Sequence, residues 1–478
     1  MRTPSIAVRR IAVLLLALAA GCATNPVTGK SELSLVSESS EISMGKKSAD
    51  DVAATVGLYP DSAVQRYVSA LGASLAARTE RPGLPWQFAV VDDPAVNAFA
   101  LPGGYVFVTR GLLTHLSSEA ELATVIGHEA GHVAAKHSVH QMSEAELATL
   151  GLGLGMALSK DIAKYGNVAA AGLGILFLKF SRDDESQADQ LGFKYALADS
   201  FDVRWMVPVF VMLDGVGKLS GGSKLPEWQS THPDPQNRVA ATKARLAALT
   251  VDLSTYKLGQ ARYLRLIDGM VYGEDPRQGY FEGTLFVHPA LKFGFQFPVG
   301  WKTQNRADAV LGMSAAQDAL IELRLVSGAT AEASQKFLSQ QGVQSEAPTH
   351  TTIHGLPAMV TVFSAQDANQ AAVQGYVAFI EYDGATYQIL SYTTAAKFSS
   401  YAWAFQRSLG SFEPITDAAV LKTQPVRVHV ERIPRAMTLK EFNTSSPSTI
   451  SLRELALING LEVGATLQPA QLVKRVSK

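Results

Sequence analysis

The sequence predicts an α+β protein in which a mainly helical domain with a small edge sheet is followed by an α+β domain and a small βααβ module. The chain of 478 residues is too long for one ordinary core. Helical periodicity dominates up to about residue 260, and beyond it alternating Phe and Val residues with glycine turns indicate strands. A composition of 47% hydrophobic and 18% charged residues is typical of folded domains, and a formal net charge of -1 indicates no nucleic-acid partner.

The N-terminus has the pattern of a secreted lipoprotein. A pair of arginines precedes an apolar run over residues 11–20, which is too short to span a bilayer well. Cys22 is the only cysteine, so it forms no internal disulfide. Its setting after Gly21 resembles a bacterial lipobox, which implies cleavage before Cys22 and a lipid on that residue. Ala23 after the cysteine implies a periplasmic protein anchored in the inner leaflet of the outer membrane.

Composition and periodicity divide the chain into five expected segments. The stretch after Cys22 is rich in Ser, Thr, Gly and Pro, which is typical of a tether. The expected segments are a signal peptide over residues 1–21, a tether over 22–40, the mainly helical domain over 41–260, the α+β accessory domain over 280–415 and the βααβ module over 425–478.

The first folded domain contains clear local patterns. Gly103-Gly104 separates two short β-rich runs, which predicts a hairpin or strand pair over residues 97–101 and 105–108. A helix is expected over residues 118–138, because Ser and Glu precede apolar positions at helical spacing. The apolar blocks 150–158 and 168–180 are each short, which favours buried or groove-lining helices over a membrane-dipping hairpin.

His128-Glu129-Ala130-Gly131-His132 is an HExxH motif on the helix predicted over residues 118–138. Two histidines four positions apart lie about 40° apart around a helix and one turn apart along it, so both imidazoles reach one Zn²⁺ ion. Glu129 lies in the same arc, where its carboxylate can take a proton from a zinc-activated water and return it to a leaving amine. The motif therefore predicts one hydrolytic zinc ion per chain.

A second helix is expected to supply the third ligand, because a catalytic zinc normally has three protein ligands and one open position. Glu185 is the strongest candidate, and Asp189 one turn later can accept the N–H of a ligand histidine. His137 and His140 would lie about 140° and 80° from His132 on a continuous helix, so we expect them to face solvent.

Several motifs together resemble the zinc endopeptidases of the CAAX prenyl protease and HtpX type, which are gluzincins. The resemblance runs from about residue 25 to residue 246. It implies a gluzincin-type metalloprotease domain that hydrolyses unfolded or misassembled cell-envelope proteins, in the branch of periplasmic lipoproteins. The motifs are Asn25-Pro26-Val27-Thr28-Gly29, Asn97 to Gly104, His128 to His132, Glu185 to Asp189, and His232-Pro233 with Arg238.

The same resemblance implies roles for residues beyond the ligands. Ala98, Phe99, Ala100 and Leu101 are expected near an edge strand that pairs with extended substrate, which reads backbone more than side chains. His232 is expected close to the metal, where it stabilises the oxyanion or fills the open position as a latch. The alternative is that His232 caps the following helix. We expect Arg238 to form a salt bridge that organises the site.

The C-terminal regions add two further resemblances and no catalytic motif. Residues 280–415 are similar to domains of the PsbP type. Residues 425–478 resemble a LysM module, which makes peptidoglycan a candidate partner. No GxSxG nucleophile elbow and no phosphate-binding GxxxxGK[ST] loop occurs. The alternative to a protease is a lipid-anchored periplasmic chaperone or scaffold with little proteolytic activity.

Overall fold

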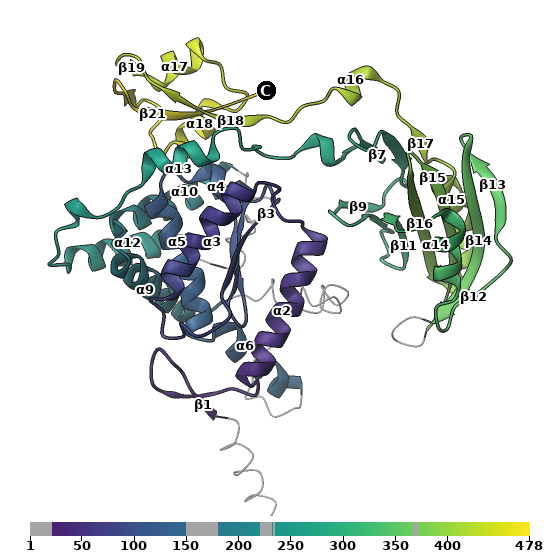
Figure 1. Cartoon of the computed structure of the whole chain (residues 1–478), viewed down its shortest axis with the longest axis horizontal. Helices are drawn as coiled ribbons and strands as arrows, with labels where there is room; N and C mark the ends of the chain where they lie inside the picture. Colours follow the sequence, from purple (N-terminus) through teal and green to yellow (C-terminus); the bar gives the residue numbers. More distant parts are fainter. Residues whose placement is uncertain (1–21, 150–179, 220–231, 233–234, 367–370) are drawn as a thin grey trace, which may run out of the picture. The chain divides into compact units, whose positions relative to one another are not determined.

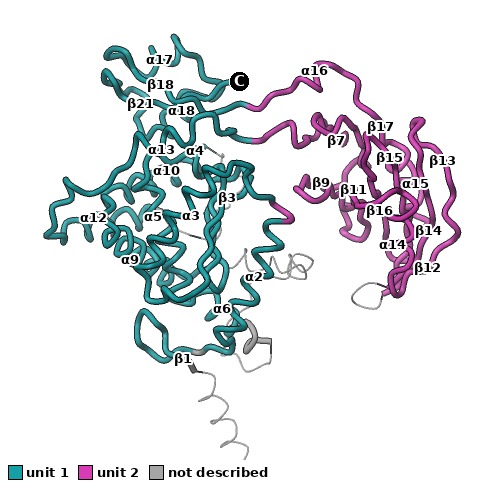
Figure 2. The backbone as a smooth tube through the Cα atoms, viewed as in Figure 1, with its two compact units in different colours: residues 1–53, 57–273, 426–478 teal, residues 54–56, 274–425 magenta. Residues whose placement is uncertain are grey.

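The computed structural model describes residues 22–149, 180–219, 232, 235–366 and 371–478 (Figure 1). The α+β class predicted from the sequence is confirmed. The chain divides into two compact units, which consist of residues 1–53, 57–273 and 426–478 and of residues 54–56 and 274–425 (Figure 2).

Membrane-spanning helices are not found in the described part of the chain, where no helix combines the necessary length and apolar character. The apolar block predicted over residues 150–158 and all of the block 168–180 except Phe180 lie outside the described residues.

The first unit is mainly helical, and its core surrounds α5 (Glu119–Ala134), which is buried from residue 120 to residue 134. Ser118 and Glu121 begin this helix with a capping box, in which each side chain accepts from the backbone N–H of the other residue. Other helices of this unit are α2 (Glu38–Thr55), α3 (Ser62–Ala76), α4 (Arg110–His115), α9 (Arg182–Ala198), α10 (Met206–Leu219), α12 (Pro235–Ala247) and α13 (Gln260–Ile267).

The end of α5 differs from the prediction of one helix over residues 118–138. The helix ends at Ala134, and Lys136 takes a φ of 60°, which is a left-handed conformation that a right-handed helix does not continue through. A new helix, α6 (His137–Thr149), then begins. Any side-chain direction predicted from a continuous helical wheel is therefore wrong beyond residue 135.

A three-stranded sheet packs against α5. Strand β5 (Tyr105–Thr109) is central, with β3 (Gln87–Val91) parallel on one side and β4 (Ala98–Leu101) antiparallel on the other. The predicted strand pair is confirmed, with Gly103 and Gly104 at positive φ in the turn. Among the described residues β4 pairs only with β5, so it is an edge strand, and α5 contacts it.

The C-terminal segment folds as strand, helix, helix and strand. Strand β18 (Arg427–Arg432) pairs antiparallel with β21 (Leu472–Ser477), and α17 (Leu439–Ser445) and α18 (Leu452–Ile458) connect them. The minor strands β19 (Met437–Thr438) and β20 (Thr466–Leu467) pair with each other. Buried residues of this segment belong to the same hydrophobic core as α5, so the segment is part of the first unit.

The second unit is an antiparallel sheet covered by one helix on each face. Side chains alternate along β15 (Ala372–Tyr382), so Ala378 and Ile380 pack with α15 (Phe398–Leu409), while Val377 and Phe379 pack with α14 (Thr330–Leu338). The strand order is β12-β14-β15-β16-β11-β10-β9, and β13 adds to β14. A smaller sheet has the order β17-β8-β7-β6.

The remaining strands of the second unit are β6 (Tyr280–Glu282), β7 (Leu285–His288), β8 (Phe293–Gln296), β9 (Lys302–Asn305), β10 (Val310–Met313), β11 (Ala319–Val326), β12 (Gln344–Ser345), β13 (Thr349–Ile353), β14 (Leu356–Gln366), β16 (Ala385–Thr394) and β17 (Glu413–Pro414). The short helix α16 (Ala418–Leu421) follows β17.

Candidate metal centre

Close packing between α5 and α9 brings the predicted ligands together. A Cβ atom at Gly192 would lie 2.7 Å from the backbone nitrogen of His128, and one at Gly131 would lie 3.2 Å from the carbonyl oxygen of Ala188. Because glycine has no side chain, the two helix backbones approach each other directly at these points. The first turn of α9 therefore faces the HExxH segment of α5, and it carries Glu185.

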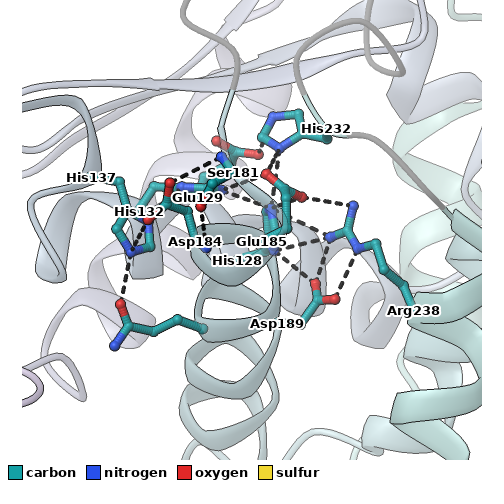
Figure 3. Close-up of polar contacts among 11 residues, drawn as sticks. His128, Glu129, His132, His137, Ser181, Asp184, Glu185, Asp189, His232 and Arg238 are labelled. Atoms are coloured by element: carbon teal, nitrogen blue, oxygen red, sulfur yellow. Dashed lines mark hydrogen bonds and ion pairs between the residues drawn. The ribbon is translucent and has the colours of Figure 1, made fainter. Parts of the chain in front are cut away.

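Four buried side chains meet at the centre of the first unit (Figure 3). His128 and His132 come from α5, Glu185 comes from α9, and His232 precedes α12. One ligand atom from each residue lies within 4.8 Å of those of the other three, and this is the one group of its kind among the described residues. The structure thus brings together the three predicted ligands and the histidine expected close to them.

The spacing of the ligand atoms fits a tetrahedral zinc ion. His132 Nε2 lies 3.0 Å from His128 Nε2 and 3.4 Å from Glu185 Oε1, and His128 Nε2 lies 3.7 Å from Glu185 Oε2. Atoms that bind one zinc tetrahedrally at about 2.0–2.1 Å lie about 3.3–3.4 Å from each other. Two imidazoles and a carboxylate are also ligand types that catalytic zinc takes.

Asp189 and Arg238 hold His128 in place. His128 Nδ1 lies 2.9 Å from Asp189 Oδ1, and because an ionised carboxylate only accepts, the ring proton is on Nδ1 and the Nε2 lone pair faces the centre. Arg238 Nε donates to Asp189 Oδ2 at 2.8 Å, and its Nη1 lies 3.1 Å from Glu185 Oε2. Burial acts to raise the pKa of Asp189, but the charge of Arg238 and the hydrogen bonds outweigh it and lower the pKa to about 2.

Glu129 and His232 face each other beside the ligands (Figure 3). Glu129 is 1% exposed, and its Oε1 makes no hydrogen bond with any described residue. Burial raises the pKa of this carboxyl. His232 Nε2 lies 3.8 Å from Glu129 Oε1, and His232 Nδ1 lies 2.7 Å from Glu185 Oε1. His232 therefore lies between the carboxylate of the HExxH motif and the carboxylate of the third predicted ligand.

His137 is not on the solvent face where the sequence placed it. It is 4% exposed, and its Nδ1 lies 2.9 Å from Nδ1 of His132. The prediction failed because it assumed one continuous helix, whereas the left-handed residue Lys136 turns the chain and directs His137 back to the site. Lys rarely adopts a left-handed conformation, so this turn could not be predicted from the residue type. His140 lies half-exposed beside Glu144.

Sequence reasoning also missed a buried ion pair that connects α5 to the edge sheet. Arg81 Nη1 donates to Glu41 Oε1 at 2.8 Å and to the carbonyl oxygen of Val133 at 3.0 Å, one residue beyond His132. The same Glu41 oxygen accepts from the backbone N–H of Gly103 at 3.1 Å. One carboxylate therefore contacts both the turn after β4 and the arginine that caps α5. A charge pair this distant in sequence leaves no periodic signal.

Part of the predicted tether is folded against the same helix end. Strands β1 (Cys22–Thr24) and β2 (Ser31–Leu33) pair, and Asn25 between them is 5% exposed. The Asn25 side-chain amide donates to the carbonyl oxygen of Ala135 at 3.1 Å. Two of the carbonyls that end α5 thus have side-chain donors from elsewhere in the chain.

The segment predicted to bind substrate forms the edge strand β4. Ala98 and Leu101 are buried, whereas Phe99 and Ala100 are half-buried. Phe99 stacks on Phe107 of the neighbouring strand, with ring centroids 5.2 Å apart. The side of β4 away from β5 has no strand partner among the described residues.

Comparison with known proteins agrees with this geometry. Residues 62–246 match the model of Peptidase family M48. The mitochondrial metalloendopeptidase OMA1 of Arabidopsis thaliana is 39% identical over 166 residues, which are 34% of this chain and 32% of that protein. The beta-barrel assembly-enhancing protease of Escherichia coli (strain K12) is 29% identical over 233 residues, which are 46% of this chain and 47% of that protein.

The chain spans between about a third and about half of the length of these two relatives. The solution structure of cyanobacterial PsbP from Synechocystis sp. PCC 6803 aligns with 28% of this chain and 94% of its own length, at 12% identity and a TM-score of 0.23, which is too weak to support an assignment. The family match covers α5, α9 and His232, and its members are zinc-dependent. Residues 62–246 of this chain, which carry the candidate metal centre, are therefore similar to peptidase family M48.

Proposed function

We propose that the chain is a zinc-dependent endopeptidase that hydrolyses peptide bonds in unfolded or misassembled proteins of the cell envelope. The observation that carries this proposal is the tetrahedral spacing of His128 Nε2, His132 Nε2 and the Glu185 carboxylate, with Glu129 buried beside them. His128, His132 and Glu185 would hold one zinc ion. When bound, the ion supplies Lewis-acid chemistry that activates water and polarises a peptide carbonyl.

Glu129 acts as general base and then as general acid in this proposal. Its carboxylate takes the proton of the attacking water and passes it to the nitrogen of the leaving amine as the C–N bond breaks. A buried carboxylate whose Oε1 makes no hydrogen bond with a described residue suits this role, because that oxygen can accept the proton of the water. Its raised pKa favours retention of that proton until transfer.

His232 has two possible roles at the centre, and its contacts support both over helix capping. Its ring reaches the carboxylates of Glu185 and Glu129, which are the groups nearest the reaction, through opposite nitrogens. As an N–H donor it would stabilise the oxyanion of the tetrahedral intermediate, and as a latch it would occupy the open ligand position. In His232→Ala, proteolysis falls under the first role and rises under the second, and an unchanged rate indicates capping alone.

The substrate class is inferred from the edge strand and from the relatives. The edge of β4, which has no second strand partner within the described ranges, lies next to the HExxH helix and can add an extended peptide by backbone hydrogen bonds, which suits unfolded polypeptide of many sequences. Ala98 to Leu101 would supply this edge. One relative is named as a protease that enhances beta-barrel assembly, which supports an envelope substrate for this chain.

Three purified proteins test the mechanism: the full wild-type chain, Glu129→Gln and the matched exposed control Glu462→Gln. Each is mixed with an unfolded protein, with and without a zinc chelator, and cleavage is followed by mass spectrometry. We expect wild type and Glu462→Gln to cleave, and Glu129→Gln and all chelated samples to be inactive. Cleavage that persists in Glu129→Gln would refute the mechanism. Absence of cleavage by the wild-type chain would favour the chaperone or scaffold.

The envelope location and its partners complete the proposal. Cys22 would carry the lipid that anchors the protein on the periplasmic side of the outer membrane, and metabolic labelling with a fatty acid, lost in Cys22→Ser, tests this. Peptidoglycan binding by residues 425–478 stays a prediction, which sedimentation of the full chain with peptidoglycan tests.

A further inference from the structure

The geometry points to His137 and Gln187 as positioning residues that set which nitrogen of His132 carries the proton, and so present the Nε2 lone pair of His132 to the metal. Neither residue is a ligand. Both lie outside the set of site residues expected from the sequence. The inference rests on the proposed function, because it deepens the account of how the zinc site is assembled.

Three contacts connect His132, through His137, to two polar side chains outside the metal centre (Figure 3). His132 Nδ1 lies 2.9 Å from His137 Nδ1, and His137 Nε2 lies 2.8 Å from Gln187 Oε1. Asp184 Oδ1 lies 3.6 Å from the same His137 nitrogen. His132 and His137 are 1% and 4% exposed, so water does not replace these partners freely.

The direction of each hydrogen bond in this series follows from the groups at its outer end, which can only accept. Asp184 can only accept, and the amide oxygen of Gln187 also accepts, so His137 carries its proton on Nε2. A neutral imidazole has one N–H, which leaves a lone pair on His137 Nδ1. His132 must then donate from its own Nδ1, and its second nitrogen, Nε2, is left with the lone pair that a metal requires.

The opposite arrangement would disable the ligand. If a donor faced His137 Nε2, the proton of His137 would move to Nδ1, and His132 would have to accept there and carry its proton on Nε2. That nitrogen is the one that lies 3.0 Å from His128 Nε2 and faces Glu185. The acceptor oxygens of Gln187 and Asp184, at the far end of this series of hydrogen bonds, therefore decide whether His132 can act as a ligand.

The two ligand histidines are thus oriented by different chemistry. His128 donates directly to the carboxylate of Asp189, which is the common partner of a metal-binding histidine. His132 donates to a second imidazole, and Phe180 stacks on its ring with centroids 4.0 Å apart. The stacked ring limits rotation of His132, so its hydrogen-bond partner fixes the proton in one orientation.

Zinc affinity tests this inference without any measurement of proteolysis. The full chain is compared with His137→Leu, Gln187→Met, Gln187→Glu and the matched control His140→Leu, which changes a half-exposed histidine of the same helix. Affinity is measured by competition with a zinc-chelating dye. We expect His137→Leu and Gln187→Met to lower affinity about 10–100-fold, since loss of such outer partners has that effect on metal sites.

Gln187→Glu and His140→Leu are expected to keep the affinity of wild type. A glutamate at position 187 accepts as the amide oxygen does, so it preserves the proton arrangement, whereas a role in packing alone would make Glu as harmful as Met. In the zinc-loaded wild type and in Gln187→Glu, NMR of the imidazole nitrogens should show the His132 proton on Nδ1. Thermal unfolding of each variant checks that it is folded. If His137→Leu does not fold, the Gln187 variants still test the inference, because position 187 is half-exposed.

Wild-type affinity in both His137→Leu and Gln187→Met, or a His132 proton on Nε2 in the zinc-loaded protein, would overturn the inference. The failure of this inference is distinct from failure of the proposed function. A wild-type chain that binds zinc but cleaves no protein refutes the protease, whereas a chain that cleaves while His137→Leu binds zinc normally refutes only the role of His137.

Discussion

The two units of the molecule bury very different side chains. The first unit encloses many charged groups, and their partners include opposite charges, backbone N–H and carbonyl groups, and histidines. The second unit encloses aromatic and aliphatic side chains with hydroxyls and amides, and Asp275 is its one buried charged residue among those described. Buried charged residues of the first unit include Glu41, Arg81, Arg110, Glu121, Glu129, Glu185, Asp189, Arg238 and Lys474.

The difference shows where stability and where chemistry are located. A buried charge costs free energy unless it is paired, and an apolar replacement is often as stable, so such groups are expected where they perform a task. In the first unit such groups contact the proposed metal ligands, the turn after the edge strand and the C-terminal segment. In the second unit the core consists largely of phenylalanine and aliphatic side chains around the sheet, and no group of side chains that could hold a metal ion occurs among its described residues.

Lys474 provides the largest expected effect on stability. Its Nζ is buried and donates to the carbonyls of Thr114, His115 and Leu116, at 3.2, 3.2 and 2.6 Å, where α4 ends. Lys474→Met keeps most of the volume but leaves these carbonyls without a donor, so we expect a loss of roughly 3–5 kcal/mol in the free energy of unfolding. The exposed control Lys440→Met should change little in the same denaturant titration. Wild-type stability in Lys474→Met would show that the hydrogen bonds from Lys474 to these carbonyls are dispensable.

The apolar unit is tested by removing one ring. Phe405 is fully buried in the core of the second unit, between Trp301 and Tyr401, so Phe405→Ala should cost about 3–5 kcal/mol through lost contacts and a cavity. Trp403→Ala on the same helix removes a ring that is 68% exposed and is the control. We expect zinc affinity to stay at the wild-type value in both. A loss of zinc affinity in folded Phe405→Ala would show that the proposed zinc site depends on the core of the second unit.

The comparison also explains how much the sequence could predict. The HExxH helix, the strand pair before it and the helices of the C-terminal segment are local patterns, and the structure contains them. Glu185 could be predicted from the sequence because its motif has a defined position in a second helix. His137, Arg81 and Lys474 were not, because each acquires its partners through a left-handed turn or through contacts between distant segments. Residue periodicity predicts which face of a helix or strand is buried, but not which charged side chain from a distant segment contacts that face.

Acid sensitivity is a property that the two units share. Burial lowers the pKa of His115 in the first unit and of His288 in the second to about 4. Because the unfolded histidine titrates near about 6.5, the unfolded state takes up more protons between these values, and stability falls as the pH falls through that window. Each histidine contributes at most about 1.4 kcal/mol per pH unit.

The histidine variants sharpen this part of the comparison. In the wild type the Nδ1 atom of His115 lies 2.7 Å from the carbonyl oxygen of Gly111. In His115→Asn the asparagine amide can still donate to this oxygen, but the asparagine side chain does not titrate. Denaturant titrations at pH 7 and pH 5 should show a smaller loss of stability in this variant than in wild type. An equal loss in both proteins would mean that other groups cause the acid sensitivity.

Exposed charges of the first unit give the smallest expected effect. Lys46 and Asp50 form an ion pair of 2.8 Å on α2, with side chains 62% and 68% exposed. Lys46→Met should change stability by less than about 1 kcal/mol, and the change should shrink further in high salt. A larger effect would mean that charge itself, and not its burial, distinguishes this unit.

The zinc content of the purified chain tests the central claim most directly. After dialysis against a limiting zinc buffer, elemental analysis should find one zinc per wild-type chain and per chain of the control Glu462→Gln, and a large loss in Glu185→Ala. X-ray absorption of the bound zinc should show imidazole and carboxylate ligands at about 2.0–2.2 Å. Full zinc occupancy in Glu185→Ala with an unchanged absorption spectrum would contradict the assignment of Glu185 as a ligand and the mechanism built on it.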